Sequence, residues 1–431
     1  MRWYAVLLLS FPLMAQHDMS NMPGMAGMPP GMQHDAGPPD VMEASGTSLN
    51  PASSPMNMLH LNAGRWRFMI HGTAFLEDTQ QSGPRGHDKL FSTSWFMTEA
   101  ERRLAGGTFA VRAMLSLEPA TVTGRRYPEL FQTGETAYGQ PIVDGQHPHN
   151  FVMELGLHYS HPLGETSSWE LYAAPVGDPA LGPVAYPHRV SAEEIPQAPL
   201  GHHLQDSTHI SYEVVTAGIT HGMVRVEASG FHGAEPDENR WYIGSGAIDS
   251  YSGRVTVSPN ANWSGQVSAG RLTKPEALEA GDQVRAEASV TYNRPYSRGN
   301  WATSAIWGRV HKTAGSAQAE GSVVRAGNSD NLNGYTLESV ARWAQKNYIT
   351  GRIELDDKDE LLTGITGMPR EFRIGAYTIG YTRDFYILPR IATGLGVNFT
   401  TYSMPGALIP YYGQRPVAGM IFLRFKLRDA S

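Results

Sequence analysis

The sequence predicts an all-β fold, an antiparallel transmembrane β-barrel of about 16 strands, preceded by a disordered arm rich in methionine and histidine. Three observations lead to this prediction. Residues 61–431 consist of short segments in which apolar and polar residues alternate. Short turns and long loops separate these segments, and the chain begins with a secretory signal.

The signal comes first along the chain. Arg2 precedes an apolar stretch at residues 3–14, and the small Ala15 ends it before a polar run. A basic start, a short apolar core and a small final residue are typical of a secretory signal. We therefore expect residues 1–15 to be a signal peptide and the mature chain to start near Gln16, outside the cytoplasm.

Residues 16–60 follow as a Gly- and Pro-rich arm without apolar periodicity, which predicts a disordered segment in the periplasm. Eight of the 18 methionines lie in it. A thioether is a soft, neutral ligand that suits Cu(I), and imidazole adds capacity for Cu(II) or zinc. We expect copper, as Cu(I) rather than Cu(II), to bind His17, Met19, Met22, Met25, Met28, Met32 and His34. The alternative is a low-complexity linker whose methionines are incidental.

Alternation defines the strands. At residues 284–292, for example, apolar side chains occupy every second position and polar ones the positions between. The predicted strands lie near residues 64–78, 89–100, 106–118, 151–161, 167–175, 207–219, 222–232, 250–258, 262–273, 281–293, 300–311, 333–344, 347–356, 371–384, 388–402 and 416–428.

The connections between these strands are short at one end and mostly long at the other, which is the outer-membrane pattern. This sorting requires residues 317–327 to be a loop, although their sequence also fits a strand. Such a barrel would enclose a water-filled lumen. Aromatic residues near strand ends would form interfacial girdles: Trp66, Trp95, Trp169, Trp263, Trp301, Trp343, Tyr348 and Tyr402.

Composition excludes several function classes. The chain has no cysteine, so it has neither disulfides nor thiolate metal sites. Its net charge of −7 argues against a nucleic-acid partner. It has no nucleophile-elbow, phosphate-loop or zinc-protease motif, so we expect neither an enzyme nor an organic cofactor.

Ten of the 16 histidines lie between residues 147 and 232. His147 and His149 fall in one predicted outer loop, and His202 and His203 fall in the next. Two nearby imidazoles bind a metal ion only with a third ligand, which here would come from another loop. These four histidines are therefore candidate metal ligands; the alternative role is loop packing and hydrogen bonding.

Alternation also assigns side chains to the lumen. The predicted lumen candidates are Met69, His71, Met114, Glu154, His158, His209 and Glu213. Carboxylates, imidazoles and thioethers on one wall would hold or pass a cation. An ordinary polar lumen with compensating charges is the alternative.

A signal, an arm with Met-x-x-Met and His-Asp-Met stretches, and an acidic-to-neutral barrel resemble the copper-resistance protein B type of outer-membrane protein. The resemblance implies copper sequestration or export at the bacterial outer membrane, with the arm in the periplasm. The implied partners are outer-membrane lipid, copper ions and periplasmic copper carriers. Rival interpretations are a passive porin for small solutes and a surface protein that binds ligands through its outer loops.

Overall fold

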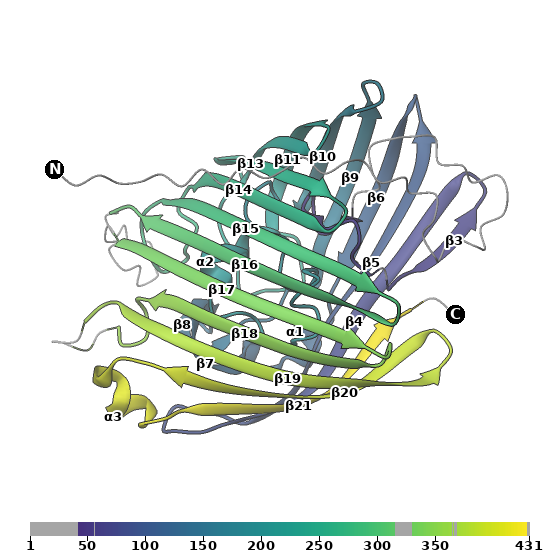
Figure 1. Cartoon of the computed structure of the whole chain (residues 1–431). Helices are drawn as coiled ribbons and strands as arrows, with labels where there is room; N and C mark the ends of the chain where they lie inside the picture. Colours follow the sequence, from purple (N-terminus) through teal and green to yellow (C-terminus); the bar gives the residue numbers. More distant parts are fainter. Residues whose placement is uncertain (1–41, 56, 315–329, 364, 366–368, 429–431) are drawn as a thin grey trace, which may run out of the picture. The chain divides into compact units, whose positions relative to one another are not determined.

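A computed structural model describes residues 42–428, apart from residues 56, 315–329, 364 and 366–368 (Figure 1). The predicted signal, the arm ligands between His17 and His34, and the segment 317–327 lie outside the described residues. Among those that are described, no helix is long and apolar enough to cross a bilayer.

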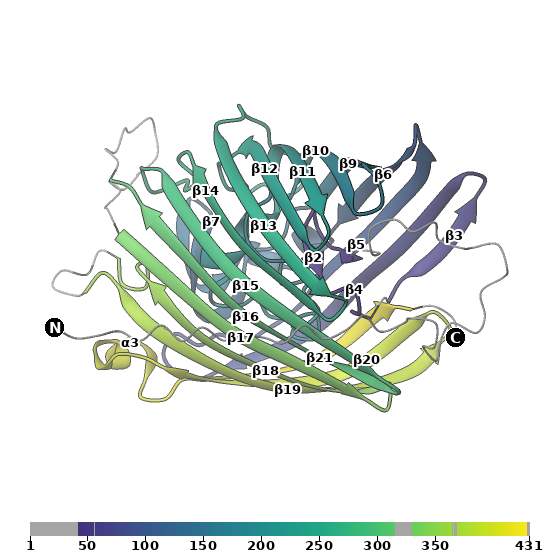
Figure 2. The same ribbon diagram turned by 45° about the horizontal axis from the view of Figure 1, so that its top comes forward.

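Sixteen long antiparallel strands of the described chain close into one barrel (Figures 1 and 2). Each pairs with its neighbour in sequence, and the last pairs with the first through Ala418–Lys426 and Thr73–Gln81. The short β3 (Leu59–Ala63) pairs with the start of the first long strand. The sixteen are β4 (Trp66–Gln81), β5 (Lys89–Leu104), β6 (Gly107–Leu115), β9 (Val152–Pro162), β10 (Ser167–Gly177), β11 (Ser211–His221), β12 (Val224–His232), β13 (Ser250–Asn260), β14 (Trp263–Leu272), β15 (Gln283–Tyr296), β16 (Gly299–Lys312), β17 (Asp330–Trp343), β18 (Asn347–Lys358), β19 (Phe372–Leu388), β20 (Ile391–Ser403) and β21 (Val417–Leu427).

The predicted fold class is confirmed, and each predicted strand corresponds to one of these sixteen. The ends differ by a few residues. The largest shifts are at β5 and β19, which run four residues further than predicted, and at β11, which starts four residues later. The late start of β11 has a local cause, because residues 207–209 form the 3-10 turn η3 (Ser207–His209).

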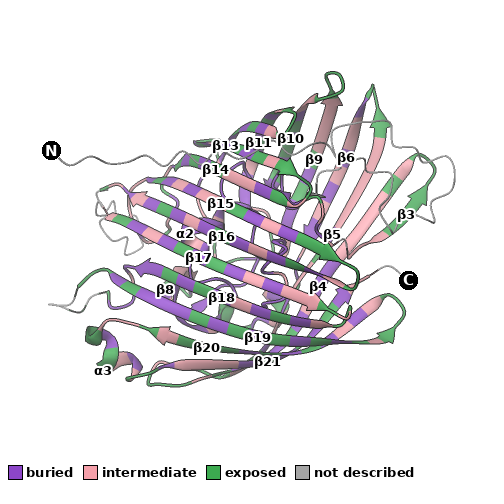
Figure 3. Ribbon diagram, viewed as in Figure 1, coloured by how far each residue is buried: buried purple, intermediate pink, exposed green. Residues whose placement is uncertain are grey.

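The outer surface of the barrel is apolar and the inner surface is charged. Along β18, Ile349 and Ile353 are exposed, whereas Arg352 and Glu354 are buried. Exposed and buried residues alternate in this way along the strands in Figure 3. An apolar exterior of this extent is stable against lipid and unstable against water.

The prediction for the aromatic girdle is correct for part of its members. Trp263, Trp301 and Trp343 are exposed on the outside. Trp95 and Tyr348 instead face inward: Trp95 packs on the rings of two histidines, and Tyr348 is 5% exposed and donates a hydrogen bond to Asp384. In the alternation along their strands, both residues occupy positions that face the lumen. The prediction considered only that they lie near a strand end, and it did not consider which face they occupy.

The prediction of a water-filled lumen is wrong for the described part of the chain, because loops fold inward. Residues 178–210 are almost all buried. They contain α2 (His202–Gln205) and η3, while the preceding long loop contains α1 (Glu118–Thr121), η2 (Thr123–Arg125), β7 (Tyr127–Ala137) and β8 (Gln140–Gln146). A third loop, with η4 (Gly406–Leu408) and α3 (Ile409–Tyr412), is largely exposed, and its buried Leu408 and Tyr412 pack in one cluster with Leu130 and Phe131. Two cavities lined by lumen residues have volumes of only about 30 and 10 Å³.

Part of the arm predicted to be disordered, residues 16–60, has a defined structure in the described chain. Residues 44–51 are buried inside the barrel, and they include β2 (Leu49–Asn50), which pairs with β1 (Met42–Glu43). Three inward arginines hold this segment: Arg112 donates to Gly46 O at 2.7 Å, Arg225 donates to Thr47 O at 3.0 Å, and Arg254 donates to Thr47 Oγ1 at 2.9 Å. Hydrogen bonds from the wall satisfy its backbone, so the segment needs no apolar periodicity of its own.

Candidate metal centre

Five histidines meet inside the barrel: His147, His149, His202, His203 and His209. They come from two inward loops, the stretch after β8 and the α2–η3 turn. Ring centroids lie 5.3 Å apart for His147 and His203, 5.0 Å for His202 and His203, 5.3 Å for His202 and His209, and 5.4 Å for His149 and His209. We call this set the five-histidine cluster.

Three members of the cluster converge most closely. One ring nitrogen from each of His147, His202 and His203 lies within 4.8 Å of the other two. His147 is 6% exposed and His202 is 1% exposed. Two ligands of one tetrahedral metal ion lie about 3.3–3.8 Å apart at ordinary bond lengths, so small side-chain rotations would bring all three nitrogens onto one ion.

Hydrogen bonds orient the rings. Asp206 accepts from Nδ1 of His202 at 2.6 Å, its backbone oxygen accepts from Nδ1 of His209 at 2.7 Å, and Glu118 accepts from Nδ1 of His149 at 3.0 Å. Because carboxylate and carbonyl oxygens only accept, each Nδ1 carries the proton and a neutral ring keeps its Nε2 lone pair. This arrangement is typical of metal-bound histidines, whose second nitrogen donates to an acceptor.

Several Nε2 atoms have no hydrogen-bond partner among the described residues, namely those of His147, His203 and His209. A carboxylate oxygen of Glu135 does lie 3.0 Å from His147 Nε2, but outside hydrogen-bond geometry. Buried polar atoms without partners are rare and unfavourable. Three such atoms lie in this one cluster, where a bound ion would give them a partner.

Burial favours the neutral form of His147, His203 and His209. Burial, reinforced by the neighbouring His202, lowers the pKa of both His147 and His203 well below the usual value. Burial together with His202 and His149 lowers the pKa of His209 to about 3. Burial alone would raise the pKa of Asp206, but His202 and Arg189 outweigh it and hold that pKa below its usual range. Neutral imidazole is the form that binds metal ions.

Ion pairs fix the loop that carries His202 and His203. Arg189 is fully buried, and its Nη1 lies 2.9 Å from Asp206 Oδ2. Its Nε lies 2.5 Å from Glu338 Oε1 on β17. The cluster is therefore tied to the barrel wall through residues that do not themselves offer a metal ligand to it.

The structure brings together all four histidines predicted as loop ligands, and it adds His209, which was predicted for the lumen. The other lumen candidates lie elsewhere. Met69, His71 and Met114 line the wall, with Met114 1% exposed. Glu154 accepts from Tyr172 at 2.8 Å and from the backbone of Gly46 at 3.3 Å, so it holds the amino-terminal segment.

Two predicted lumen residues behave differently from one another. His158 faces inward, with its Nε2 3.1 Å from Glu170. Glu213 does not follow the predicted alternation, because a β-bulge between Tyr212 and Val215 places it at φ +52°. Beyond the bulge, the even-numbered Val214 and Thr216 are buried and face the lumen, whereas Val215 is exposed. Glu213 shares the odd-numbered positions with Val215, so the prediction that it faces the lumen is wrong.

Sequence reasoning did not identify the residues that orient the cluster. Glu118 lies 31 positions before His149, and nothing local links the two. The spacing of four residues within a helical turn would have been a usable signal for the contact between His202 and Asp206.

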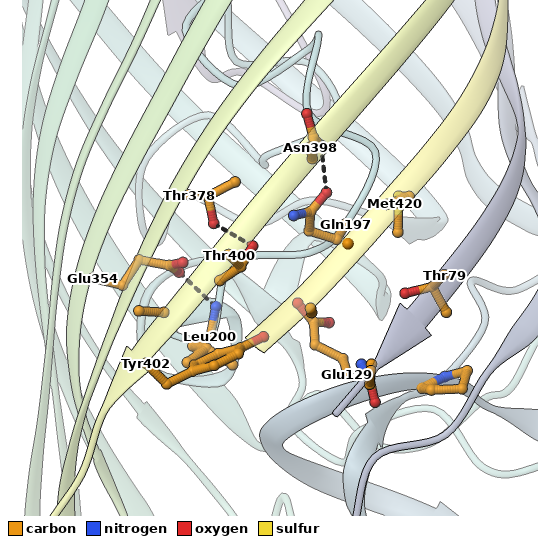
Figure 4. Close-up of a pocket in the computed structure, with 15 residues that line it drawn as sticks. Thr79, Glu129, Gln197, Leu200, Glu354, Thr378, Asn398, Thr400, Tyr402 and Met420 are labelled. Atoms are coloured by element: carbon orange, nitrogen blue, oxygen red, sulfur yellow. Dashed lines mark hydrogen bonds between the residues drawn. The ribbon is translucent and has the colours of Figure 1, made fainter. Parts of the chain in front are cut away.

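A small cavity lies apart from these histidines, between the inward loops and strands β18–β21 (Figure 4). Glu129, Gln197 and Glu354 line it with Thr378 and Asn398. Glu354 accepts from the backbone of Leu200 at 2.6 Å, and Asn398 donates to Gln197 at 2.8 Å. Its volume of about 30 Å³ has room for one or two water molecules, so it is not a solute site.

Known structures share the barrel. The chain is similar to an anion-selective porin from Comamonas acidovorans, with 10% identity, a TM-score of 0.52, and coverage of 84% of this chain and 99% of that one. It is also similar to Salmonella typhi OmpF in complex with daunomycin, with 10% identity, a TM-score of 0.51, and coverage of 85% and 100%.

No protein-family model matches the sequence, and no curated protein matches it. At 10% identity the structural likeness concerns the fold alone. The chain therefore has the closed antiparallel barrel architecture of the outer-membrane porins.

Proposed function

We propose that this chain is a barrel of the bacterial outer membrane that binds a transition-metal ion inside its lumen. The observation that carries the proposal is the convergence of ring nitrogens from His147, His202 and His203 within 4.8 Å of one another. His147 and His202 are buried and His203 is half-buried, and Nε2 of His147 and of His203 has no hydrogen-bond partner among the described residues. The apolar outer surface and the porin-type architecture support the membrane location.

Copper is the ion that we propose as cargo. Imidazole binds zinc, copper, nickel and iron, so the cluster alone leaves the ion open. The arm, with its thioethers at Met19, Met22, Met25, Met28 and Met32 beside His17 and His34, favours copper and specifically Cu(I). The arm would collect copper in the periplasm, directly or from periplasmic copper carriers, and the cluster would retain it, which amounts to sequestration or a step of export.

Tethering supplies the physical reason for this arrangement. The predicted arm would keep its ligands at roughly millimolar effective concentration near the lumen, because it is joined to the segment that enters the barrel. Several weak sites in series would let an ion exchange between them, whereas one very tight site would trap it.

A passive channel for small solutes is the second candidate. The likeness to solved porins favours it, since the architecture is the same. The buried inward loops argue against it, because they leave small cavities between the described residues. Single-channel conductance that is insensitive to copper and to changes in the arm would support the passive channel.

The test uses the purified full chain in detergent. Co(II) reports imidazole coordination through its visible spectrum and has little affinity for thioethers, so it reads the cluster rather than the arm methionines. The His203→Ala variant removes a ring whose Nε2 makes no hydrogen bond. The matched control is His221→Ala, which removes an exposed histidine at the β11–β12 turn.

We expect one tightly bound Co(II) in the wild type and in the control, and an affinity lower by about tenfold or more in His203→Ala. Copper should compete with Co(II) for the same site. Equal affinity in the wild type and His203→Ala would contradict the proposal. Competition by zinc but not by copper would keep the site and remove copper as its cargo.

A further inference from the structure

A second group of soft and imidazole ligands lies in the lumen, outside the five-histidine cluster. Nε2 of His188 is 3.2 Å from Sδ of Met114. Met114 points inward from β6, and His188 comes from the long inward loop. They are 74 residues apart in sequence, and both are buried, at 1% and 8% exposure.

The surroundings of this pair are soft and aromatic. The ring centroid of Trp95 lies 4.2 Å from that of His188 and 5.1 Å from that of His71. His71 and His188 are 6.5 Å apart, centroid to centroid. Met114 packs in one apolar cluster with Met97 and Met153.

The imidazole of His188 is poorly satisfied by protein alone. Its Nδ1 has no hydrogen-bond partner among the described residues, and its Nε2 contacts only a thioether, which is a weak acceptor. Burial, followed by the neighbouring rings of His71, His209 and His149, lowers the pKa of His188 well below the usual value.

The backbone at His188 is nevertheless held in place. Asn50 of the amino-terminal segment donates to the backbone oxygen of His188 at 2.9 Å, and the adjacent Arg189 is paired with Asp206 and Glu338. A rigid backbone with an unsatisfied side chain is what a preorganised ligand site requires.

We infer that His188 and Met114 form a second metal site in the lumen, selective for a soft monovalent ion, Cu(I), with His71 beside it as a further imidazole. A neutral nitrogen and a neutral sulfur bind such an ion without losing a proton, and thioether sulfur discriminates against Zn(II) and other harder ions. The separation of 3.2 Å is close to that of two ligands on one ion, at bond lengths of about 2.0 and 2.3 Å, so the backbone need not move.

This inference goes beyond the proposed function in ligand chemistry and in position. The cluster of His147, His202 and His203 offers nitrogen only, whereas this site offers nitrogen and sulfur. Either site can bind an ion when the other does not, so the two claims are tested separately.

The experiment follows methionine methyl groups by NMR in the full chain, labelled with carbon-13 at the methionine methyls and titrated with Ag(I), a redox-inert stand-in for Cu(I). Leucine replaces Met19, Met22, Met25, Met28 and Met32, so that the arm does not compete for the ion. The Met114 signal is assigned by its loss in Met114→Leu. Met420, a buried methionine on β21 in another apolar cluster, is the internal control.

We expect the first equivalents of Ag(I) to shift the Met114 methyl and leave the Met420 methyl unmoved, while Zn(II) moves neither. In His188→Phe, which keeps a ring but removes the nitrogen ligand, the Met114 shift should need at least about tenfold more Ag(I). A Met114 methyl that stays unmoved as Ag(I) saturates the protein would overturn the inference, as would an equal response in His188→Phe. A Met114 response in a chain that binds no Co(II) would leave this site standing and remove the three-histidine site.

Discussion

Gly134 leaves the space that the ring of His203 occupies in the five-histidine cluster. It sits in β7 at φ +126°, and a Cβ at this position would lie 2.6 Å from the ring of His203. Only glycine combines that backbone conformation with that close approach. The residue thus makes room for a histidine that makes no hydrogen bond through Nε2.

We therefore predict that Gly134→Ala displaces His203 and lowers the Co(II) affinity of the full chain by about tenfold or more. Gly164→Ala serves as the control, since Gly164 lies at a comparable φ of +112° but its Cβ would meet nothing within 4 Å. Backbone strain is common to both variants, so a loss of affinity confined to Gly134→Ala isolates the contact with His203. If both variants lost Co(II) affinity equally, backbone strain would be the cause and the contact with His203 would not.

Asp206 is the residue on which most of the cluster's contacts depend. Its side chain accepts from His202 and pairs with Arg189, while its backbone oxygen accepts from His209. Removing an outer partner of a metal-bound histidine typically lowers metal affinity by about 10–100-fold.

For Asp206→Asn we predict a loss in that range, together with easier thermal unfolding, because the buried Arg189 loses its charge partner. Binding is measured by Co(II) titration and unfolding by circular dichroism. Asp88→Asn, at an exposed loop position, should change neither quantity. Unchanged Co(II) affinity in Asp206→Asn would mean that the carboxylate does not orient His202 for binding.

At the scale of elements, the amino-terminal segment behaves as part of the barrel rather than as a tail. Gly46 lies at φ +55°, and a Cβ there would be 2.3 Å from the backbone oxygen of Asp178. Ser45 donates to the side chain of Asp178 at 2.7 Å. A larger residue at position 46 is incompatible with both features.

The chain has no cysteine, so a single introduced thiol reports directly on this segment. We predict that Ser48→Cys, at a position 2% exposed, reacts slowly with a maleimide in the folded chain and rapidly once Gly46→Val is added. Asp88→Cys provides the rate of an exposed thiol. A thiol at position 48 that reacts as fast as this reference, without the second change, would show that the segment does not stay in the lumen.

The strands also show how much of the fold the sequence can predict. Period-two alternation identified all sixteen long strands, because each has a lipid face and a lumen face. The same rule failed at Glu213, where a bulge shifts the phase, and for Tyr348, which was assigned to a girdle although its side chain faces inward.

The alternation of apolar and polar residues cannot predict that the long loops fold inward. Contacts between distant residues hold these loops, such as the ion pair of Arg189 with Glu338 and the hydrogen bond from Lys358 to the backbone oxygen of Leu200. The histidine content of residues 147–232 did indicate the cluster. The partners that orient it come from distant positions such as Glu118 and remained hidden.

At the scale of the whole molecule, a barrel with an apolar outer surface surrounds a lumen filled by its own loops and amino-terminal segment. A barrel with this interior should conduct much less than an open porin. In planar bilayers we predict low conductance for the full chain and a measurable increase in Gly46→Val, whose segment cannot seat against Asp178. Porin-like conductance of the unaltered chain would favour the passive channel instead.

The central claim is that the lumen holds a metal ion on three loop histidines, and anomalous diffraction from crystals of the copper-loaded full chain tests it most directly. We predict a peak at the copper edge about 2.0–2.1 Å from a ring nitrogen of each of His147, His202 and His203. Anomalous density confined to other places, with these three rings left as they are in the metal-free chain, would contradict it.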